Sequence, residues 1–141
     1  MNTLDVRRAL VVGLAVFAGT MLLSVLLVMG YSLAINPGHT DEYYRSAATW
    51  IAPWASHVGG PVLFFFLNYR HTRHHPQASP VPFAFATIGS YVLFDLASVP
   101  LFGLRLATVL TLPFFVSLAV KLSGALGGAI LGARASRSGS A

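Results

Sequence analysis

Four long apolar runs occupy most of this chain and constrain its fold more than any other feature. They lie at about residues 9–35, 47–69, 83–100 and 106–132. Charged side chains are almost absent from them, because only Asp95 interrupts the third run and only Lys121 the fourth. An α-helix needs about 20 apolar residues to cross the hydrocarbon core of a bilayer, which is about 30 Å thick. We therefore expect four membrane-spanning segments.

The pattern within the runs favours helices over the strands of a barrel. Inside a bilayer the backbone must satisfy its own hydrogen bonds, so only helices and closed barrels span it. Barrel strands are segments of about ten residues with alternating hydrophobicity, whereas these runs are continuous. We predict an all-α integral membrane protein with a single domain, residues 1–141, that forms an antiparallel bundle of four transmembrane helices. The small, polar tail at residues 133–141 is expected to be disordered.

The first run is expected to be a retained span rather than a cleaved signal. The apolar region of a secretory signal has about 7–15 residues, and this run is longer.

Arginine residues predict the orientation of the spans. An even number of spans puts both termini on one side, and that side would carry six arginines against two on the other: Arg7, Arg8, Arg70, Arg73, Arg134 and Arg137, opposed by Arg45 and Arg105. By the positive-inside rule, both termini are predicted to be cytoplasmic. The short loops favour a bacterial inner membrane. The net charge of +5 is interpreted as contact with anionic headgroups of the lipid bilayer, not with nucleic acid.

The second run contains Gly59, Gly60 and Pro61 near its middle. A proline removes a backbone donor and clashes with the preceding turn, and neighbouring glycines weaken a helix further. We therefore predict a helix break. Transporter sites are often built at such interruptions, where freed carbonyls can bind a solute.

Ionisable residues within the spans are candidates for function. Such residues are rare, usually face the bundle interior and are functional hypotheses by default. His57 and Asp95 could form a pair that relays a proton or holds a cation beside the glycine–proline segment. In the structural alternative, Arg105 reaches across a tight outer turn and neutralises Asp95, and His57 is neutral and bonded to a neighbouring carbonyl or hydroxyl. Lys121 is expected to extend its long stem toward the inner headgroups.

Three glycines recur at every fourth position of the last run, Gly124, Gly128 and Gly132. Glycines with this spacing line one helix face and allow close approach of another helix. The row predicts helix packing, either within the four-helix bundle or at the seam of a dimer.

A histidine cluster follows the second run, at His71, His74 and His75. Imidazoles with this spacing can share one helix face and ligate a metal. The spacing resembles one histidine box of the membrane di-iron desaturases and hydroxylases, over residues 71–75, and the resemblance implies a metal-dependent membrane enzyme. That family needs several boxes, and only His39 and His57 remain. A basic collar that contacts anionic lipid is therefore favoured, and no cofactor is predicted.

Three functions follow from these patterns. The first is a non-enzymatic accessory or assembly subunit that acts by helix association, in a homo-oligomer or a larger membrane complex. It is preferred because the chain is small, has short loops and carries the glycine row. The second is a small oligomeric transporter or ion pathway that uses His57 and Asp95. The third is a membrane enzyme with a metal at the histidine cluster. No catalytic residue is predicted, and the pattern defines no substrate or partner.

Overall fold

The computed structural model describes residues 3–75, 77, 79–103 and 105–138. Within these ranges the chain is helical and contains no strand. Four helices are long and apolar enough to span a membrane: Asp5–Ile35, Asp41–His74, Pro80–Ser98 and Leu112–Ser138. The expectation of an all-helical chain with four apolar spans is confirmed at this level.

The helical elements follow one another with short connections. In chain order they are α1 (Thr3–Gly30), the π-helical turn η1 (Tyr31–Ile35), α2 (Asp41–Trp54), the π-helical turn η2 (Ala55–Gly59), α3 (Gly60–His74), α4 (Pro80–Ser98), the 3-10 turn η3 (Pro100–Phe102), α5 (Leu106–Val109) and α6 (Leu112–Ser138). The second span is thus built from α2, η2 and α3. It starts where the Thr40 hydroxyl accepts a hydrogen bond from the Tyr43 amide, 3.4 Å away, which is the usual cap of a helix N-terminus.

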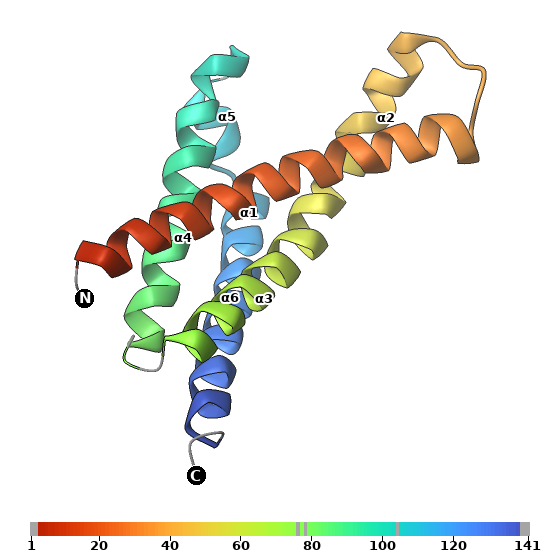
Figure 1. Ribbon diagram of the computed structural model, residues 1–141. Coiled ribbons are helices and arrows are strands. Elements are labelled where there is room, and N and C mark those ends of the chain that lie inside the picture. Colours follow the sequence, from red (N-terminus) through yellow and green to blue (C-terminus); the bar gives the residue numbers. More distant parts are fainter. Residues whose placement is uncertain (1–2, 76, 78, 104, 139–141) are drawn as a thin grey trace.

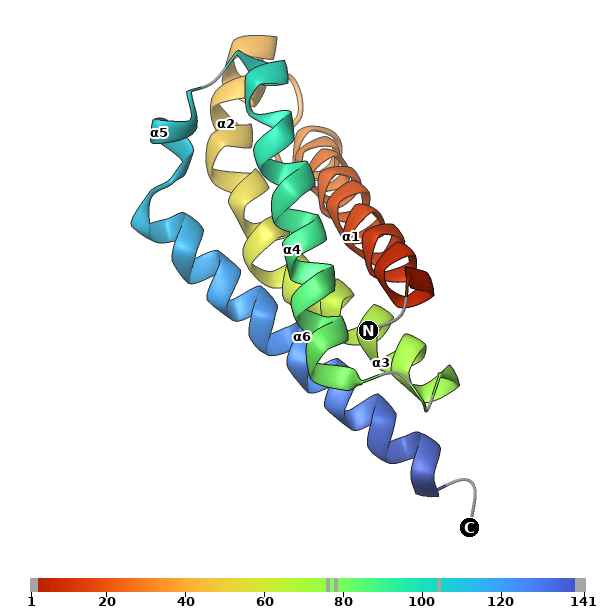
Figure 2. The ribbon, with the colours of Figure 1, turned by 90° about the vertical axis from the view of Figure 1, so that its left-hand side faces the viewer.

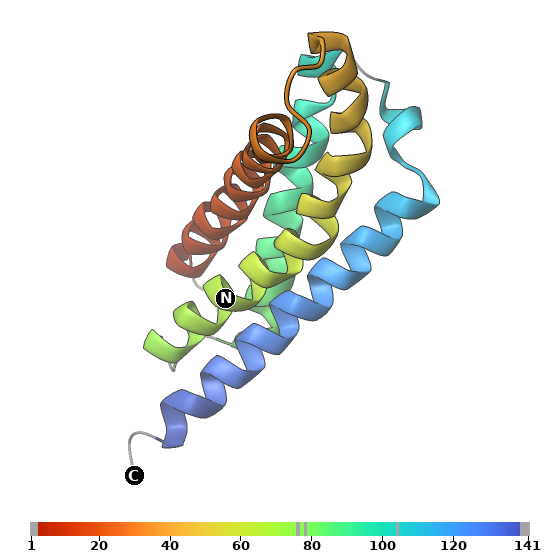
Figure 3. The ribbon, with the colours of Figure 1, turned by 90° about the vertical axis from the view of Figure 1, so that its right-hand side faces the viewer.

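Helices α1 and α6 lie on opposite sides of the molecule (Figures 2 and 3). Helices α3 and α4 lie between them, and α1 crosses α4 at a large tilt (Figure 1). The main packed pairs are α3 with α6 and α1 with α4. Their shared apolar core consists of Val16, Phe64, Ala84, Ile88, Tyr91, Ala125 and Ala129.

The glycine–proline segment of the second span does not break the helix. Gly59 and Gly60 both have right-handed helical dihedrals, and the span runs without interruption over Asp41–His74. The irregularity takes the form of the π-helical turn η2, directly before Gly60. A π turn accommodates an extra residue without ending the helix. The predicted break is therefore wrong, and a widened turn stands in its place.

Two boundaries in the last part of the chain also differ from the expectation. The fourth span begins at Leu112 rather than near residue 106, because α5 ends at Val109 and a turn separates it from α6. Residues 133–138 are helical and not disordered, since α6 continues to Ser138. The hydroxyls of Ser136 and Ser138 donate to carbonyls of the preceding turn. Residues 139–141 lie outside the described part of the chain.

The glycine row of α6 faces α3 of the same chain. A Cβ atom at Gly124 would meet the carbonyl of Pro61, one at Gly128 the carbonyl of Phe65, and one at Gly132 the carbonyl of Tyr69. The backbones of the two helices are therefore in close contact along this row. While α3 occupies this face, a second copy of the chain cannot use it as a seam.

Buried hydrogen bonds connect α3 to α6 and to α4. The Thr72 hydroxyl donates to the carbonyl of Ala129 on α6 over 2.9 Å. The Thr87 hydroxyl of α4 lies 3.3 Å from Oδ1 of Asn68, and all three polar side chains are buried. Such interhelical bonds contribute about 1 kcal/mol each in a membrane. They therefore help to fix the positions of α3, α4 and α6 relative to one another.

Candidate functional site

Lys121 is the centre of a polar cluster inside the apolar part of the helices. Its side chain is 3% exposed. The ammonium group donates hydrogen bonds to the hydroxyls of Ser56 on η2, at 2.7 Å, and Ser117 on α6, at 2.8 Å. Its nitrogen also lies 4.9 Å from the centroid of the Tyr91 ring, within the range of a cation–π interaction. The expectation that Lys121 extends to the headgroups is wrong, because these partners hold the ammonium group inside the protein.

Further polar groups surround this ammonium. The Tyr91 hydroxyl of α4 lies beside the hydroxyls of Ser56 and Thr20. Asp95, one turn later on α4, is partly buried and interacts electrostatically with Lys121. We call this set the polar cluster: Thr20, Ser56, Tyr91, Asp95, Ser117 and Lys121. Each of the four spans contributes at least one member, so the cluster exists only when the spans are assembled.

The glycine at position 60 makes room for the lysine stem. A Cβ atom on Gly60 would lie 2.7 Å from Cε of Lys121, which is closer than carbon atoms approach without a shift. The adjacent turn η2 carries Ser56, and π-helical turns occur frequently at functional sites. The segment identified in the sequence therefore contributes to the site through the side of the helix that Gly60 leaves open.

The other residues of that segment contact different helices. A Cβ atom on Gly59 would meet the side chain of Leu23 on α1, and Pro61 turns its carbonyl to Gly124 of α6. His57 lies on another side of η2 from this contact with the lysine. Its Nδ1 atom is 2.7 Å from the carbonyl of Pro53, and its ring lines a groove of about 300 Å³ with Pro53 and Trp54.

Lys121 is an electrostatic partner of Asp95 that the sequence patterns did not suggest. Asp95 interacts with Lys121, whereas His57 bonds within its own helix. Arg105 lies exposed in the connection between η3 and α5. The structure brings the Asp95 carboxyl and the Lys121 ammonium group into electrostatic range of each other.

The histidine cluster divides at the end of α3. The rings of His71 and His75 are 4.7 Å apart between centroids, and His71 stacks on Phe83 of α4 at 3.9 Å. His74 is exposed. Because α3 ends at His74 and His75 has a φ of −128°, the helical register that would align three imidazoles is lost. In the described ranges no group of three potential ligands could hold a metal ion.

The chain matches no protein-family model, no curated protein and no solved structure.

Proposed function

We propose that this chain is a small proton pathway of a bacterial inner membrane, centred on Lys121 and Asp95. The observation that carries the proposal is the burial of the Lys121 ammonium, which is 3% exposed and lies between three spans. A charged side chain at membrane depth is costly, and where one is found it usually marks an ion or proton route. A helix that needed only apolar packing at this position would carry no ammonium group.

The chemistry of the cluster is suited to moving a proton. Hydroxyls both donate and accept hydrogen bonds, and those of Ser56 and Tyr91 lie between the ammonium group and Thr20 on α1. Asp95 lies one turn from the end of α4 at Ser98, closer to a membrane surface than the lysine. An acid near the surface and a base at depth, in electrostatic range of each other, form the two ends of the proposed relay.

The orientation in this proposal has both termini in the cytoplasm. The basic residues of the two termini and of the connection after α3 support it, because positive loops stay inside. The N-terminus, the C-terminus and the connection between α3 and α4 lie toward the same end of the molecule (Figure 2). The antiparallel order of the spans agrees with this assignment.

The proposal predicts proton flux in proteoliposomes. With a potassium gradient and valinomycin as the driving force, an internal pH-sensitive dye should report faster acidification than in empty liposomes. Lys121→Met and Asp95→Asn should each lower the rate by about tenfold or more, because each removes a group that exchanges the proton. Ser123→Ala is the matched control, since Ser123 is exposed on α6 and bonds only to the carbonyl of Ala119.

Two results would exclude the proton pathway. The first is a wild-type rate equal to that of empty liposomes. The second is an undiminished rate in folded Lys121→Met protein.

A second candidate function, helix association, is favoured by the groove between α1 and α2. This groove has a volume of about 430 Å³ and is lined largely by small side chains: Ser24, Val25, Val28, Met29, Ser32, Ala48 and Ala52. The last part of α1 and the beginning of α2 lie to one side of α4 and α6 (Figure 1), and no residue from Met21 to Ser46 is buried. Small residues on two helices allow a third to approach closely. A transmembrane helix of another polypeptide is the proposed occupant.

Cross-linking tests the association. Because the chain has no cysteine, Ala48→Cys introduces a unique thiol in the groove, and Leu131→Cys, on the exposed side of α6, is the control. In native membranes we expect Ala48→Cys to give a cross-linked product between this chain and another polypeptide, and Leu131→Cys to give none. A product with the mass of two copies would indicate self-association, and equal yields at both positions would count against a specific groove.

A further inference from the structure

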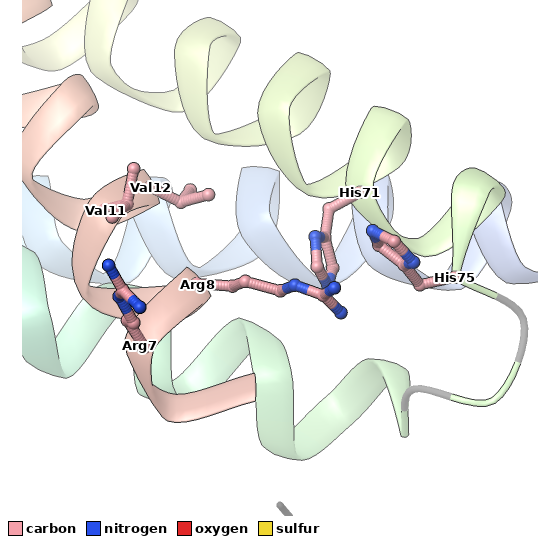
Figure 4. Close-up of a pocket in the computed structure, with 6 residues that line it drawn as sticks. All are labelled: Arg7, Arg8, Val11, Val12, His71 and His75. Carbon is pink, nitrogen blue, oxygen red and sulfur yellow. The ribbon is translucent and has the colours of Figure 1, made fainter. Parts of the chain in front are cut away.

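A basic pocket lies between the beginning of α1 and the end of α3. A pocket of about 420 Å³ is lined by Arg7, Arg8, Val11, Val12, His71 and His75. Figure 4 shows the Arg8 side chain extending from α1 toward both imidazoles of α3. Arg8, His71 and His75 thus approach one another from helices that are more than sixty positions apart in the chain, and Arg7 lines the pocket at a distance from the imidazoles (Figure 4).

One polar side-chain atom of the residues that line this pocket has no hydrogen-bond partner among the described residues. Nε2 of His71 is buried and makes no hydrogen bond in the described structure. An unsatisfied buried nitrogen destabilises a fold by about 1–3 kcal/mol, so a hydrogen-bond partner supplied by a ligand would stabilise the ring of this pocket-lining residue. The stacking of this ring on Phe83, 3.9 Å between centroids, holds the nitrogen in a fixed orientation.

The charges and the shape of the pocket define the ligand. Asp5 is the acidic group within electrostatic range of His71, and one carboxylate reduces but does not cancel the charge of two arginines. Guanidinium groups bind phosphate oxygens in pairs, and an imidazole can supply a further donor. Val11 and Val12 add an apolar wall. Basic pockets between helices at the end of a span are suited to phospholipid headgroups.

We propose that Arg7, Arg8, His71 and His75 form a binding site for a phosphate group, which an anionic phospholipid headgroup supplies. The site is distinct from the polar cluster around Lys121, and its existence does not depend on proton movement. Arg8 and the Nε2 atom of His71 hold the phosphate oxygens, and the valines contact the glycerol backbone of the lipid.

Native mass spectrometry of the full chain in detergent tests this site. Wild-type protein should retain one phosphatidylglycerol at a lipid concentration about tenfold lower than Arg8→Gln protein, because a charge-assisted bond is lost. His71→Phe, which keeps an aromatic ring to stack on Phe83, should show a similar loss. Arg73→Gln is the matched control, since it removes the same charge from an exposed position of α3. Phosphatidylcholine should be retained less than phosphatidylglycerol by wild type.

The outcomes separate the possible sources of the phosphate group. If titration calorimetry shows that inorganic phosphate binds wild type but not Arg8→Gln, while phosphatidylglycerol retention is equal in the two, the site stands and its ligand is free phosphate. Equal losses of phosphatidylglycerol in Arg8→Gln and Arg73→Gln would overturn the proposal in favour of a diffuse basic collar. Failure of both probes to bind wild type would also overturn it. Arg8 is exposed, so its variant decides the matter even if His71→Phe does not fold.

Discussion

Gly128→Ala is expected to lower the free energy of unfolding by about 2 kcal/mol, whereas Gly127→Ala should be neutral or stabilising. A Cβ atom on Gly128 would collide with the backbone of Phe65 on α3, and its contacts there are the carbonyl oxygen, the carbonyl carbon and Cα. Backbone atoms in a helix cannot move aside as a flexible side chain can. A Cβ atom on Gly127 would lie 3.7 Å from the Phe65 ring, which is an ordinary contact.

The two adjacent glycines form a matched pair. Both lie within α6 and gain the same helix propensity on replacement by alanine, at most about 1 kcal/mol. Their difference therefore measures the contact with α3. Titration of the folded protein with SDS in mixed micelles, followed by circular dichroism, reports the unfolding free energies. Equal stability of the two variants would show that α6 does not pack on α3 through the glycine row. A change of oligomer size without loss of stability would assign the row to a dimer seam.

The spans could be predicted because the stability of a helix in the bilayer depends on the average polarity of about 20 residues. One charge does not remove a segment from the bilayer if it finds partners, and Asp95 and Lys121 left their runs recognisable as spans. The same averaging explains the errors at the boundaries. Pro113 was compatible with a span that began earlier, but it lies in the first turn of α6, where a missing amide breaks no bond. Residues 133–138 were polar enough to suggest disorder, yet helix α6 continues through them.

The candidate site could be predicted only in part, because burial depends on what lies opposite a side chain. Asp95 was recognisable as an acid within a span. The direction of the Lys121 side chain depends on Gly60 and Ser56, two residues of another span, and no periodicity in α6 reveals them. The spacing of Ser117 and Lys121, one turn apart in the apolar first half of α6, was the available signal. The histidine spacing was misleading because it assumed a helix that ends at His74.

Asp95→Asn is expected to destabilise the fold by about 3 kcal/mol, and addition of Lys121→Met should recover at least half of that loss. Removal of the acid leaves the buried ammonium group with neutral partners alone, and an uncompensated charge at membrane depth is strongly unfavourable. Methionine has an unbranched side chain that fits the space beside Gly60 without the charge. Lys121→Met alone should be milder, because Asp95 is only partly buried and can be solvated.

The double-mutant cycle separates this interaction from the flux experiment, since it needs no transport. Unfolding free energies of the wild type, the two single variants and the double variant, measured by the same SDS titration, give the coupling energy between the two sites. A favourable coupling of about 1 kcal/mol or more is expected for charges that stabilise each other across α4 and α6. Additive losses would mean that Lys121 depends on its serine hydroxyls and on Tyr91 alone, and a relay that begins at Asp95 would then lose its physical basis.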